Sequence, residues 1–368
     1  MTEIFFLQAE CGDAAYIYFE DAAGTGRHML IDAGYERTYA HILRDTIDRA
    51  RQIDAFVISH IHDDHIGGAI AYLKAVERGE TIDKVVHWLY NPPRPRTIVM
   101  LPSPAISTAA SIEQGDRLAA YLKKIGKLPE QDVGTNAGVM NIHGLQLHWL
   151  SPTPQKLQHL RSKYADPAVP LEKEESPVIS NASGAGGDDY TTRIEDFKLT
   201  SWKQDANIEN GSSIAFYTDL DGFKVLWLAD AHPRVIVQSL KNLGHTLKNR
   251  FKCEIVKLTH HASKGNNSDA MFDLIDCRRY VISANGENKH FLPSKESLAR
   301  LLRNKHRDVQ KEHFELHFTY DNATLRRIFE VDGNGVFDRW NFSLHFVKPG
   351  ENAIKLQVPS SVYKRLSW

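Results

Sequence analysis

The sequence SHIHDDHIGG, residues Ser59–Gly68, carries three histidines and two aspartates within six consecutive positions. It follows an apolar run at 55–58, which the pattern predicts to be a short buried strand, and a helical pattern begins at Ile66. The order strand, turn and helix lets several side chains converge, because the end of the strand fixes the backbone before the turn. His60 and His62 are two residues apart, so they point the same way in an extended chain.

This density of imidazole and carboxylate groups predicts a metal site. His60 and His62 are expected to bind one ion, and Asp64 and His65 are placed to serve a second ion beside it. A solvated polar turn is the alternative interpretation. It is disfavoured because histidine is uncommon and a chance H-x-H-x-D-H directly after a strand is rare.

Length and charge are compatible with one large α/β domain carrying insertions, and we predict a single domain over residues 1–368. The 45 Lys and Arg nearly cancel the 46 Asp and Glu, so there is no global basic field for nucleic acid. Cys11, Cys253 and Cys277 form no C-x-x-C pair and are expected to be reduced thiols of a cytoplasmic protein. No signal-peptide pattern and no apolar run of about 20 residues is evident, so no membrane insertion is expected.

The other periodicities predict alternating strands and helices. Strands are expected at 4–7, 15–19, 27–32, 55–59, 85–90, 145–150, 212–218, 223–229, 254–259 and 279–284. Helices are expected at 39–51, 66–78, 111–124, 233–243, 270–275 and 294–304, the last capped by Ser294. Residues 91–135 and 165–205 are predicted insertions or loops, and strands at 314–319, 325–331 and 341–347 would form a β-rich C-terminal extension, 310–368.

Three of these predicted strands end in metal-binding residue types. Ser59 is followed by His60, Ala229 by Asp230, and Thr259 by His260. Strand ends at one edge of a sheet are neighbours in space even when they are far apart in sequence. The pattern therefore predicts that these side chains converge.

In this order the motifs resemble the metallo-β-lactamase superfamily, and within it the ComEC-like branch, named for the hydrolase domain of competence proteins. The segments that carry the resemblance are Gly12-Asp13, Asp32-Ala33-Gly34, His60–Gly68, Asn210–Ile214, Asp230, His260–Ser263 and the loop from Asn285 to Pro293. The resemblance implies an α/β fold, a four-layer αββα sandwich with insertions between its two halves and extra C-terminal strands. The sequence departs from the branch where Ala229 and Ala262 replace glycines.

The resemblance also implies roles for single residues. Asp32 would support the ligands by hydrogen bonding without touching a metal, and Asp230 is the candidate bridging carboxylate. Either His260 or His261 would complete the shell, and His260 is preferred because it directly follows its strand. The other histidine would contact substrate or give a proton to the leaving group. Asp64, His260 and His261 are therefore the candidate catalytic residues.

Further candidates lie around this set. Many superfamily members have a histidine in the third motif. His143, His148 and His159 lie in the interval before Asp230, but none fits clearly, and a surface or packing role is expected for all three. In the branch an Asn-x-x-Ser segment takes the place of the third-motif histidine. The candidates for supporting or substrate-binding roles are Asp32, Asn210, Ser212, His232, Ser263 and His290. For His232 and His290, a solvated loop position is an equal alternative. For Ser263, the alternative is a helix N-cap.

Two divalent metals about 3.5–4 Å apart would share a hydroxide bridge and supply a nucleophile at neutral pH. The ligand set suits zinc first, with manganese or iron as alternatives. The resemblance implies a phosphodiesterase or nuclease, and Arg94-Pro95-Arg96 is one local basic stretch that could meet a nucleic acid. An ester, thioester, lactone or lactam hydrolase on the same site, or a non-catalytic metal-binding component of a multi-protein system, is the alternative.

Overall fold

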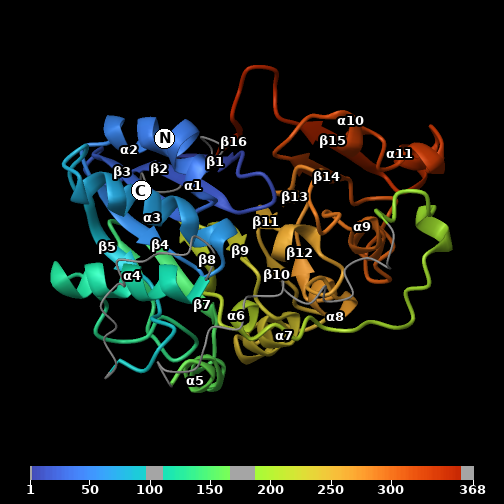
Figure 1. Ribbon diagram of the computed structural model, residues 1–368. Coiled ribbons are helices and arrows are strands. Elements are labelled where there is room, and N and C mark those ends of the chain that lie inside the picture. The colour runs from blue at the N-terminus through green and yellow to red at the C-terminus, as the bar shows by residue number, and fades with distance from the viewer. Residues whose placement is uncertain (1, 97–110, 166–186, 358–368) are drawn as a thin grey trace.

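The computed structural model describes residues 2–96, 111–165 and 187–357, and within them two large sheets face each other (Figure 1). The first sheet has the order β16 (Ala353–Gln357), β1 (Thr2–Leu7), β2 (Ala14–Glu20), β3 (Gly26–Ala33), β4 (Ile53–Val57) and β5 (Val85–Leu89). Its strands pair antiparallel from β16 to β3 and parallel from β3 to β5.

The second sheet repeats this arrangement with more strands. Its order is β15 (Phe342–Phe346), β14 (Phe314–Phe318), β13 (Arg279–Ile282), β11 (Ile255–Lys257), β9 (Phe223–Trp227), β8 (Ala215–Leu220), β7 (Leu145–Ser151) and β6 (Met140–Ile142). Pairing is antiparallel from β6 to β9 and parallel from β9 to β15. A separate short parallel pair joins β10 (Phe251–Lys252) to β12 (Ile275–Asp276).

Helices cover the outer face of each sheet. Those on the first half are α1 (Glu36–Thr38), the π-helical turn η1 (Tyr39–Leu43), α2 (Arg44–Arg49), α3 (Asp63–Glu77) and α4 (Ser111–Lys124). The others are α5 (Pro154–Lys163), η2 (Ile194–Asp196), α6 (Ile208–Gly211), α7 (Pro233–Asn242), η3 (Thr259–Ala262), α8 (Asp269–Phe272), α9 (Lys295–Leu302), α10 (Ala323–Arg326), η4 (Glu330–Asp332) and α11 (Val336–Arg339).

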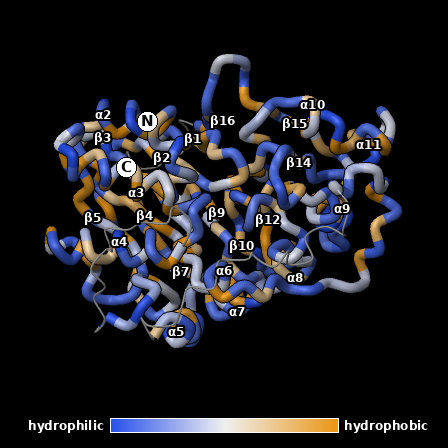
Figure 2. The backbone as a smooth tube through the Cα atoms, in the orientation of Figure 1, coloured by the Kyte–Doolittle hydropathy of each residue, from blue (hydrophilic) through white to orange (hydrophobic). Residues whose placement is uncertain are grey.

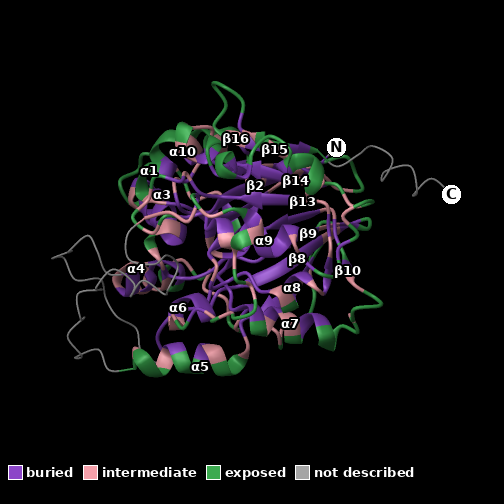
Figure 3. Cartoon of the chain, turned by 90° about the vertical axis from the view of Figure 1, so that its right-hand side faces the viewer, coloured by how far each residue is buried: buried purple, intermediate pink, exposed green. Residues whose placement is uncertain are grey.

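Three hydrophobic clusters define the layers. One cluster fills the space between the sheets, with Ile17, Ala55 and Val281 among its members. A second lies under α2, α3 and α4, and a third lies under α7, α8 and α9. Hydrophobic segments accordingly follow the strands (Figure 2), while the outward sides of α5 and α7 are exposed (Figure 3). The predicted four-layer αββα sandwich is confirmed.

The close approach of α3 to the end of β3 depends on glycine. The Gly68 amide donates a hydrogen bond to the Gly34 carbonyl at 2.8 Å. A Cβ atom at Gly68 would lie 2.1 Å from the Ala33 carbonyl oxygen, well inside van der Waals contact. The glycines of the SHIHDDHIGG stretch therefore let the helix lie directly against the strand that carries Asp32.

In the C-terminal part, one predicted strand is wrong and one strand was not predicted. The strand predicted at 325–331 is wrong, because this segment holds the end of α10 and the turn η4. Asn322 caps α10 by accepting a hydrogen bond from the Leu325 amide at 2.9 Å, and Leu325, Ile328 and Phe329 follow helical spacing. Conversely, the sequence pattern does not predict Ala353–Gln357 as a strand, and this segment forms β16 beside β1.

The insertions lie partly outside the described residues, which leave out 97–110 of the predicted segment 91–135 and 166–186 of the segment 165–205. The described part of the second segment packs on α9. The Asp189 carboxylate accepts hydrogen bonds from the Lys295 and Glu296 amides at 2.7 and 2.9 Å. Asp189 therefore caps α9, and Ser294, the predicted cap, occupies the N-cap position without a side-chain cap bond.

Candidate metal centre

The candidate site lies where the carboxyl ends of the parallel strands meet. His60 follows β4, Asp230 follows β9, and the pair His260 and His261 follows β11. Asp32 stands near the end of β3 in the same region. The predicted convergence of distant strand ends is therefore present in the structure, and ligands are commonly held at such ends in α/β sheets.

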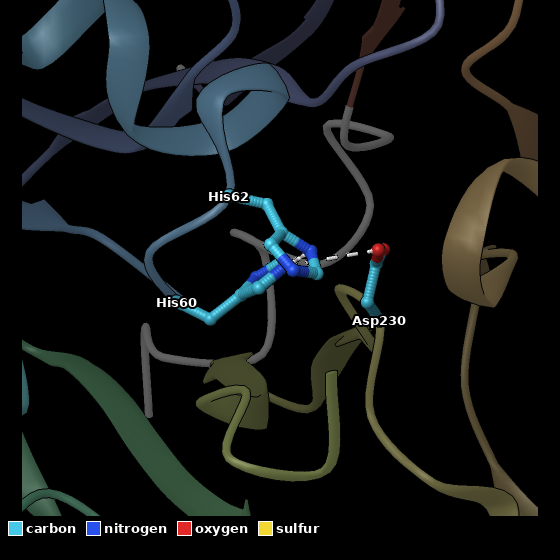
Figure 4. Close-up of side chains that lie close together, drawn as sticks. All are labelled: His60, His62 and Asp230. Carbon is cyan, nitrogen blue, oxygen red and sulfur yellow. Dashed lines mark hydrogen bonds and ion pairs between the residues drawn. The ribbon is translucent and has the colours of Figure 1, made fainter. Parts of the chain in front are cut away.

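One cluster joins His60, His62 and Asp230 (Figure 4). The His60 Nε2 atom lies 3.0 Å from His62 Nδ1 and 3.8 Å from Asp230 Oδ2. One suitable atom from each residue lies within 4.8 Å of the others. His60 and Asp230 are buried and His62 is half-buried, so most of the group is shielded from solvent.

A second cluster lies beside the first and joins Asp64, His65 and His261. The His261 Nε2 atom is 3.1 Å from Asp64 Oδ2, and His65 Nε2 is 3.8 Å from the same oxygen. Asp230 lies between the clusters, since its Oδ1 atom is 3.4 Å from His65 Nε2 while its Oδ2 atom faces His60. A carboxylate with one oxygen toward each group is placed as a bridge.

Unpaired polar atoms indicate what the clusters are built to hold. His65 Nε2 and Asp230 Oδ1 are buried, and neither makes a hydrogen bond within the described part of the chain. Leaving such groups unsatisfied costs about 1–3 kcal/mol each, and a bound ion would satisfy them. Two neighbouring sets of imidazole and carboxylate atoms with these free positions fit a pair of divalent cations.

Asp32 lies in hydrogen-bond contact with Ser59 and His65. Its carboxylate accepts hydrogen bonds from the Ser59 amide and hydroxyl, both at 2.7 Å. The same carboxylate lies 2.7 Å from His65 Nδ1. That contact places the imidazole proton on Nδ1 and turns the Nε2 lone pair toward Asp230.

His261 is held from the opposite side by Ser283 and by Asp13, a motif residue to which the sequence assigned no role. Its Nδ1 atom donates to the Ser283 carbonyl at 3.0 Å and lies 3.3 Å from Asp13 Oδ1. Asp13 also pairs with the buried Lys257 ammonium. Burial alone would raise the pKa of Asp13, but Lys257 and His261 hold it well below its ordinary range. A lysine inside the apolar run 255–258 was the available sequence signal.

His260 faces the first cluster from a different network. Its Nδ1 atom donates to Asn266 Oδ1 at 2.8 Å, and its Nε2 atom lies 3.6 Å from Asp230 Oδ2. The Asp205 carboxylate accepts hydrogen bonds from the side-chain amides of Asn266 at 3.2 Å and Asn210 at 2.6 Å. Asn210 therefore reaches His260 both through Asp205 and directly, with its Nδ2 atom 3.5 Å from His260 Nδ1. No sequence pattern singled out Asp205.

Three consecutive residues at this turn have left-handed backbone conformations, with φ of 47° at His260, 52° at His261 and 64° at Ala262. This geometry is uncommon for residues other than glycine. It sends the two adjacent imidazoles in different directions, and their ring planes lie 77° apart. One turn can therefore serve both clusters.

The remaining candidates lie outside the ligand set. The Ser212 hydroxyl donates to the Glu209 carbonyl at 2.6 Å, which closes the end of α6. His232 Nε2 donates to the Asn207 carbonyl at 2.9 Å, and its Nδ1 atom contacts Lys156 Nζ at 3.0 Å. Ser263 ends η3 as its C-cap, so its interpretation as a helix N-cap is wrong.

His290 lies close enough to the clusters to be affected by their charges. Burial, then Lys289 and His260, lower the pKa of His290 to about 4, and Asp64 acts in the opposite direction. His148 lies elsewhere, on β7, where its ring stacks on Tyr217 with centroids 4.4 Å apart. This contact agrees with the packing role expected for His148.

The fold and the two clusters define a candidate two-metal centre of an αββα protein. Residues 12–95 match the family model described as Metallo-beta-lactamase superfamily, and this segment holds His60, His62, Asp64 and His65. The match places the segment in a superfamily of metal-dependent hydrolases. A search of curated proteins finds no significant match.

Two solved structures are similar in part. Igni18, described as a novel metallo hydrolase from the archaeon Ignicoccus hospitalis, aligns over 98% of this chain and 100% of its own with 10% identity and a TM-score of 0.39. CmlA, described as a diiron β-hydroxylase from Streptomyces venezuelae, aligns over 97% of this chain with 10% identity and a TM-score of 0.43. This chain spans about half of CmlA, 54% of its length.

Among the helices of the described residues, none has the length and apolarity that crossing a bilayer requires.

Proposed function

We propose that this protein is a metal-dependent hydrolase of phosphodiester bonds, of the ComEC-like branch. The observation that carries the proposal is the position of Asp230, whose two oxygens face two neighbouring ligand clusters. The order of the motifs from Gly12-Asp13 to His260–Ser263 supports the branch. Within this superfamily, two-metal sites of this kind serve hydrolysis, and in-line attack at phosphorus is a reaction they suit.

We assign His60, His62 and Asp230 to one cation, and Asp64, His65 and His261 to the other, with Asp230 shared. Zinc suits this set best, and manganese or iron are the alternatives. When bound, such a pair of cations lowers the pKa of water and withdraws charge from the oxygen of the scissile group. The chain's own part is to hold the imidazoles in one tautomer, which Asp32 does for His65 and the Ser283 carbonyl for His261.

His260 is assigned to the substrate rather than to the metals, which reverses the preference drawn from the sequence. His261 is 1% exposed in its side chain and lies 3.1 Å from Asp64, whereas the His260 side chain is 20% exposed. Asn266 holds the Nδ1 atom of His260, and the Nε2 atom of this partly exposed ring lies 3.6 Å from Asp230 Oδ2, beside the first cluster. His260 is placed to contact the substrate or to give up a proton.

The surroundings favour a small or single-stranded phosphodiester over duplex DNA. Arg94 pairs with Asp116 at 2.7 Å, and Arg96 pairs with Asp132 at 2.6 Å, so this basic stretch is already neutralised. Trp88 and Tyr90 are buried in the core under α3 and α4, where they cannot stack on bases. A duplex substrate would need several free cations along a groove.

Location and partners form part of the same proposal. The free, buried thiols of Cys11, Cys253 and Cys277 support a cytoplasmic location. We propose that any partner proteins belong to the same multi-gene system.

The test combines metal analysis with a substrate panel. We expect about two divalent ions per purified chain and turnover of a chromogenic phosphodiester that falls at least ~100-fold in His62→Ala and Asp64→Ala. His148→Ala, on β7 and stacked on Tyr217, is the matched histidine control and should keep full turnover. Persisting turnover in both site variants would refute the proposal. Turnover of a chromogenic carboxylic ester without any phosphodiester turnover would instead establish the ester-hydrolase alternative.

A further inference from the structure

A second group of histidines lies at the far edge of the second sheet, on β14 and β15. Glu315 and His317 are two residues apart on β14, so both side chains project from the same face of the sheet. The strands are parallel, and His317 pairs in register with His345 on β15. This face is the one that carries Val281 on the adjacent strand β13, which pairs with His317.

The three side chains lie in direct contact. The His317 Nε2 atom lies 3.0 Å from Glu315 Oε2. The rings of His317 and His345 stack with centroids 4.6 Å apart and planes 19° apart. One ligand atom from each of the three residues lies within 4.8 Å of the other two.

Burial differs among the three residues in a useful way. His317 is 6% exposed and anchored, while Glu315 is intermediate and His345 is exposed. A tetrahedral zinc ion with bonds of about 2.0–2.1 Å holds its ligand atoms roughly 3.3 Å apart. Bringing ligand atoms that lie within 4.8 Å of one another to this spacing needs a shift of up to about 1.5 Å, which the exposed His345 side chain can make by changing its rotamer.

We propose that Glu315, His317 and His345 form a further metal site for a divalent transition-metal ion. Two imidazoles and one carboxylate are a ligand set that zinc accepts, and nickel and copper also prefer imidazole. A water molecule would complete the coordination. This group shares no residue with the two clusters around Asp230, so the inference is independent of the proposed hydrolase function.

An ion at this position would join two strands at the edge of a sheet. In the strand order of the described residues, β15 is an edge strand and pairs with β14 through one parallel ladder. A ligand that binds only the folded state stabilises it in proportion to the logarithm of its concentration above Kd. The expected role is therefore to hold the C-terminal strands in register.

The test is to count zinc ions bound to the full-length protein after equilibrium dialysis against micromolar zinc. Wild type is expected to hold one zinc ion more per chain than His345→Ala or Glu315→Gln, and turnover in the hydrolase assay should be unchanged. His306→Ala, which removes a histidine elsewhere on the chain, is the control and should bind as much as wild type. Equal zinc content in wild type, His345→Ala and Glu315→Gln would overturn the proposal.

A second measurement guards against a folding artefact. In thermal unfolding, added zinc should raise the midpoint of wild type more than that of Glu315→Gln, which keeps the size of the side chain. Because Glu315→Gln changes no residue of the clusters around Asp230, loss of hydrolase activity in this variant would also count against an independent site.

Discussion

Substituting Gly68 by alanine should destabilise the protein strongly, although alanine is ordinarily the better helix former. The new methyl group would lie 2.1 Å from the Ala33 carbonyl oxygen, which is a backbone atom and cannot rotate away. Helix α3 or the end of β3 would have to move by about 1 Å to restore contact distance. Either movement disturbs Asp32 and the turn at 60–65 together.

The size of the effect follows from two contributions. Overpacking a close-packed interior costs about 1–3 kcal/mol. The shift also stretches the bond from the Gly68 amide to the Gly34 carbonyl, now 2.8 Å, which contributes about 1 kcal/mol net. Against this stands about 1 kcal/mol gained from the higher helix propensity of alanine. We therefore expect a loss of about 2–3 kcal/mol in the free energy of unfolding, near the upper part of the overpacking range.

Urea unfolding followed by circular dichroism is the suitable assay, with the same chain carrying Gly138→Ala as control. A Cβ atom at Gly138 meets nothing within 4 Å, so that variant should change stability by less than about 0.5 kcal/mol. Gly68→Ala should also bind zinc more weakly, because Asp64 and His65 lie one turn before it in α3. A stability equal to that of Gly138→Ala would refute the close-approach argument.

Three other perturbations test separate parts of the structure. Asp32→Asn places an amide N–H against His65 Nδ1, so zinc affinity should fall about 10–100-fold in chelator competition, and unchanged affinity would contradict the orienting role. A second perturbation concerns Asp132. Burial raises the pKa of its carboxyl, but Arg161 and Arg96 outweigh burial and lower that pKa to about 2. Asp132→Asn should therefore cost about 1 kcal/mol above roughly pH 4, where the wild-type carboxylate is ionised. The difference from wild type should shrink as the pH falls from about 4 through 2 and vanish only below about 2, where the Asp132 carboxyl is protonated. Lys295→Met should cost about 3–5 kcal/mol in urea unfolding, because it leaves the Asp332 carboxylate buried without the ammonium now 2.6 Å away, and Lys295→Met with Asp332→Asn should recover part of the loss.

The sequence predicts those parts of the fold whose hydrophobic pattern is local. The strand before His60 and the helix after it follow from the apolar run and the two glycines, and both are present as β4 and α3. Strand β16 could not be found in this way, since Ala353–Gln357 alternates only weakly and pairs with β1, at the other end of the chain. The error at 325–331 arose because a short helix with apolar residues at helical spacing also contains a dense apolar run.

The candidate ligand residues could be named from the sequence because histidine and aspartate are concentrated at strand ends. The residues that orient these side chains could not be named from the sequence. Ser283, for example, acts through its backbone carbonyl, which a residue of any type could supply. Asp205 and Asn266 lie in irregular segments and act only through three-dimensional contacts. The directions of the His260 and His261 side chains depend on a left-handed backbone conformation, which two adjacent positions in a sequence do not disclose.

The three left-handed residues at 260–262 also bear on how the sequence can change over time. Each such residue other than glycine is held in a conformation that costs roughly 1–2 kcal/mol. Glycine would relieve the cost at Ala262, but it would remove an imidazole at either of the other two positions. At this turn, keeping both imidazoles therefore conflicts with lowering the conformational energy of the backbone. A variant of this chain that is destabilised elsewhere would have less surplus folding stability to offset the conformational cost of both histidines.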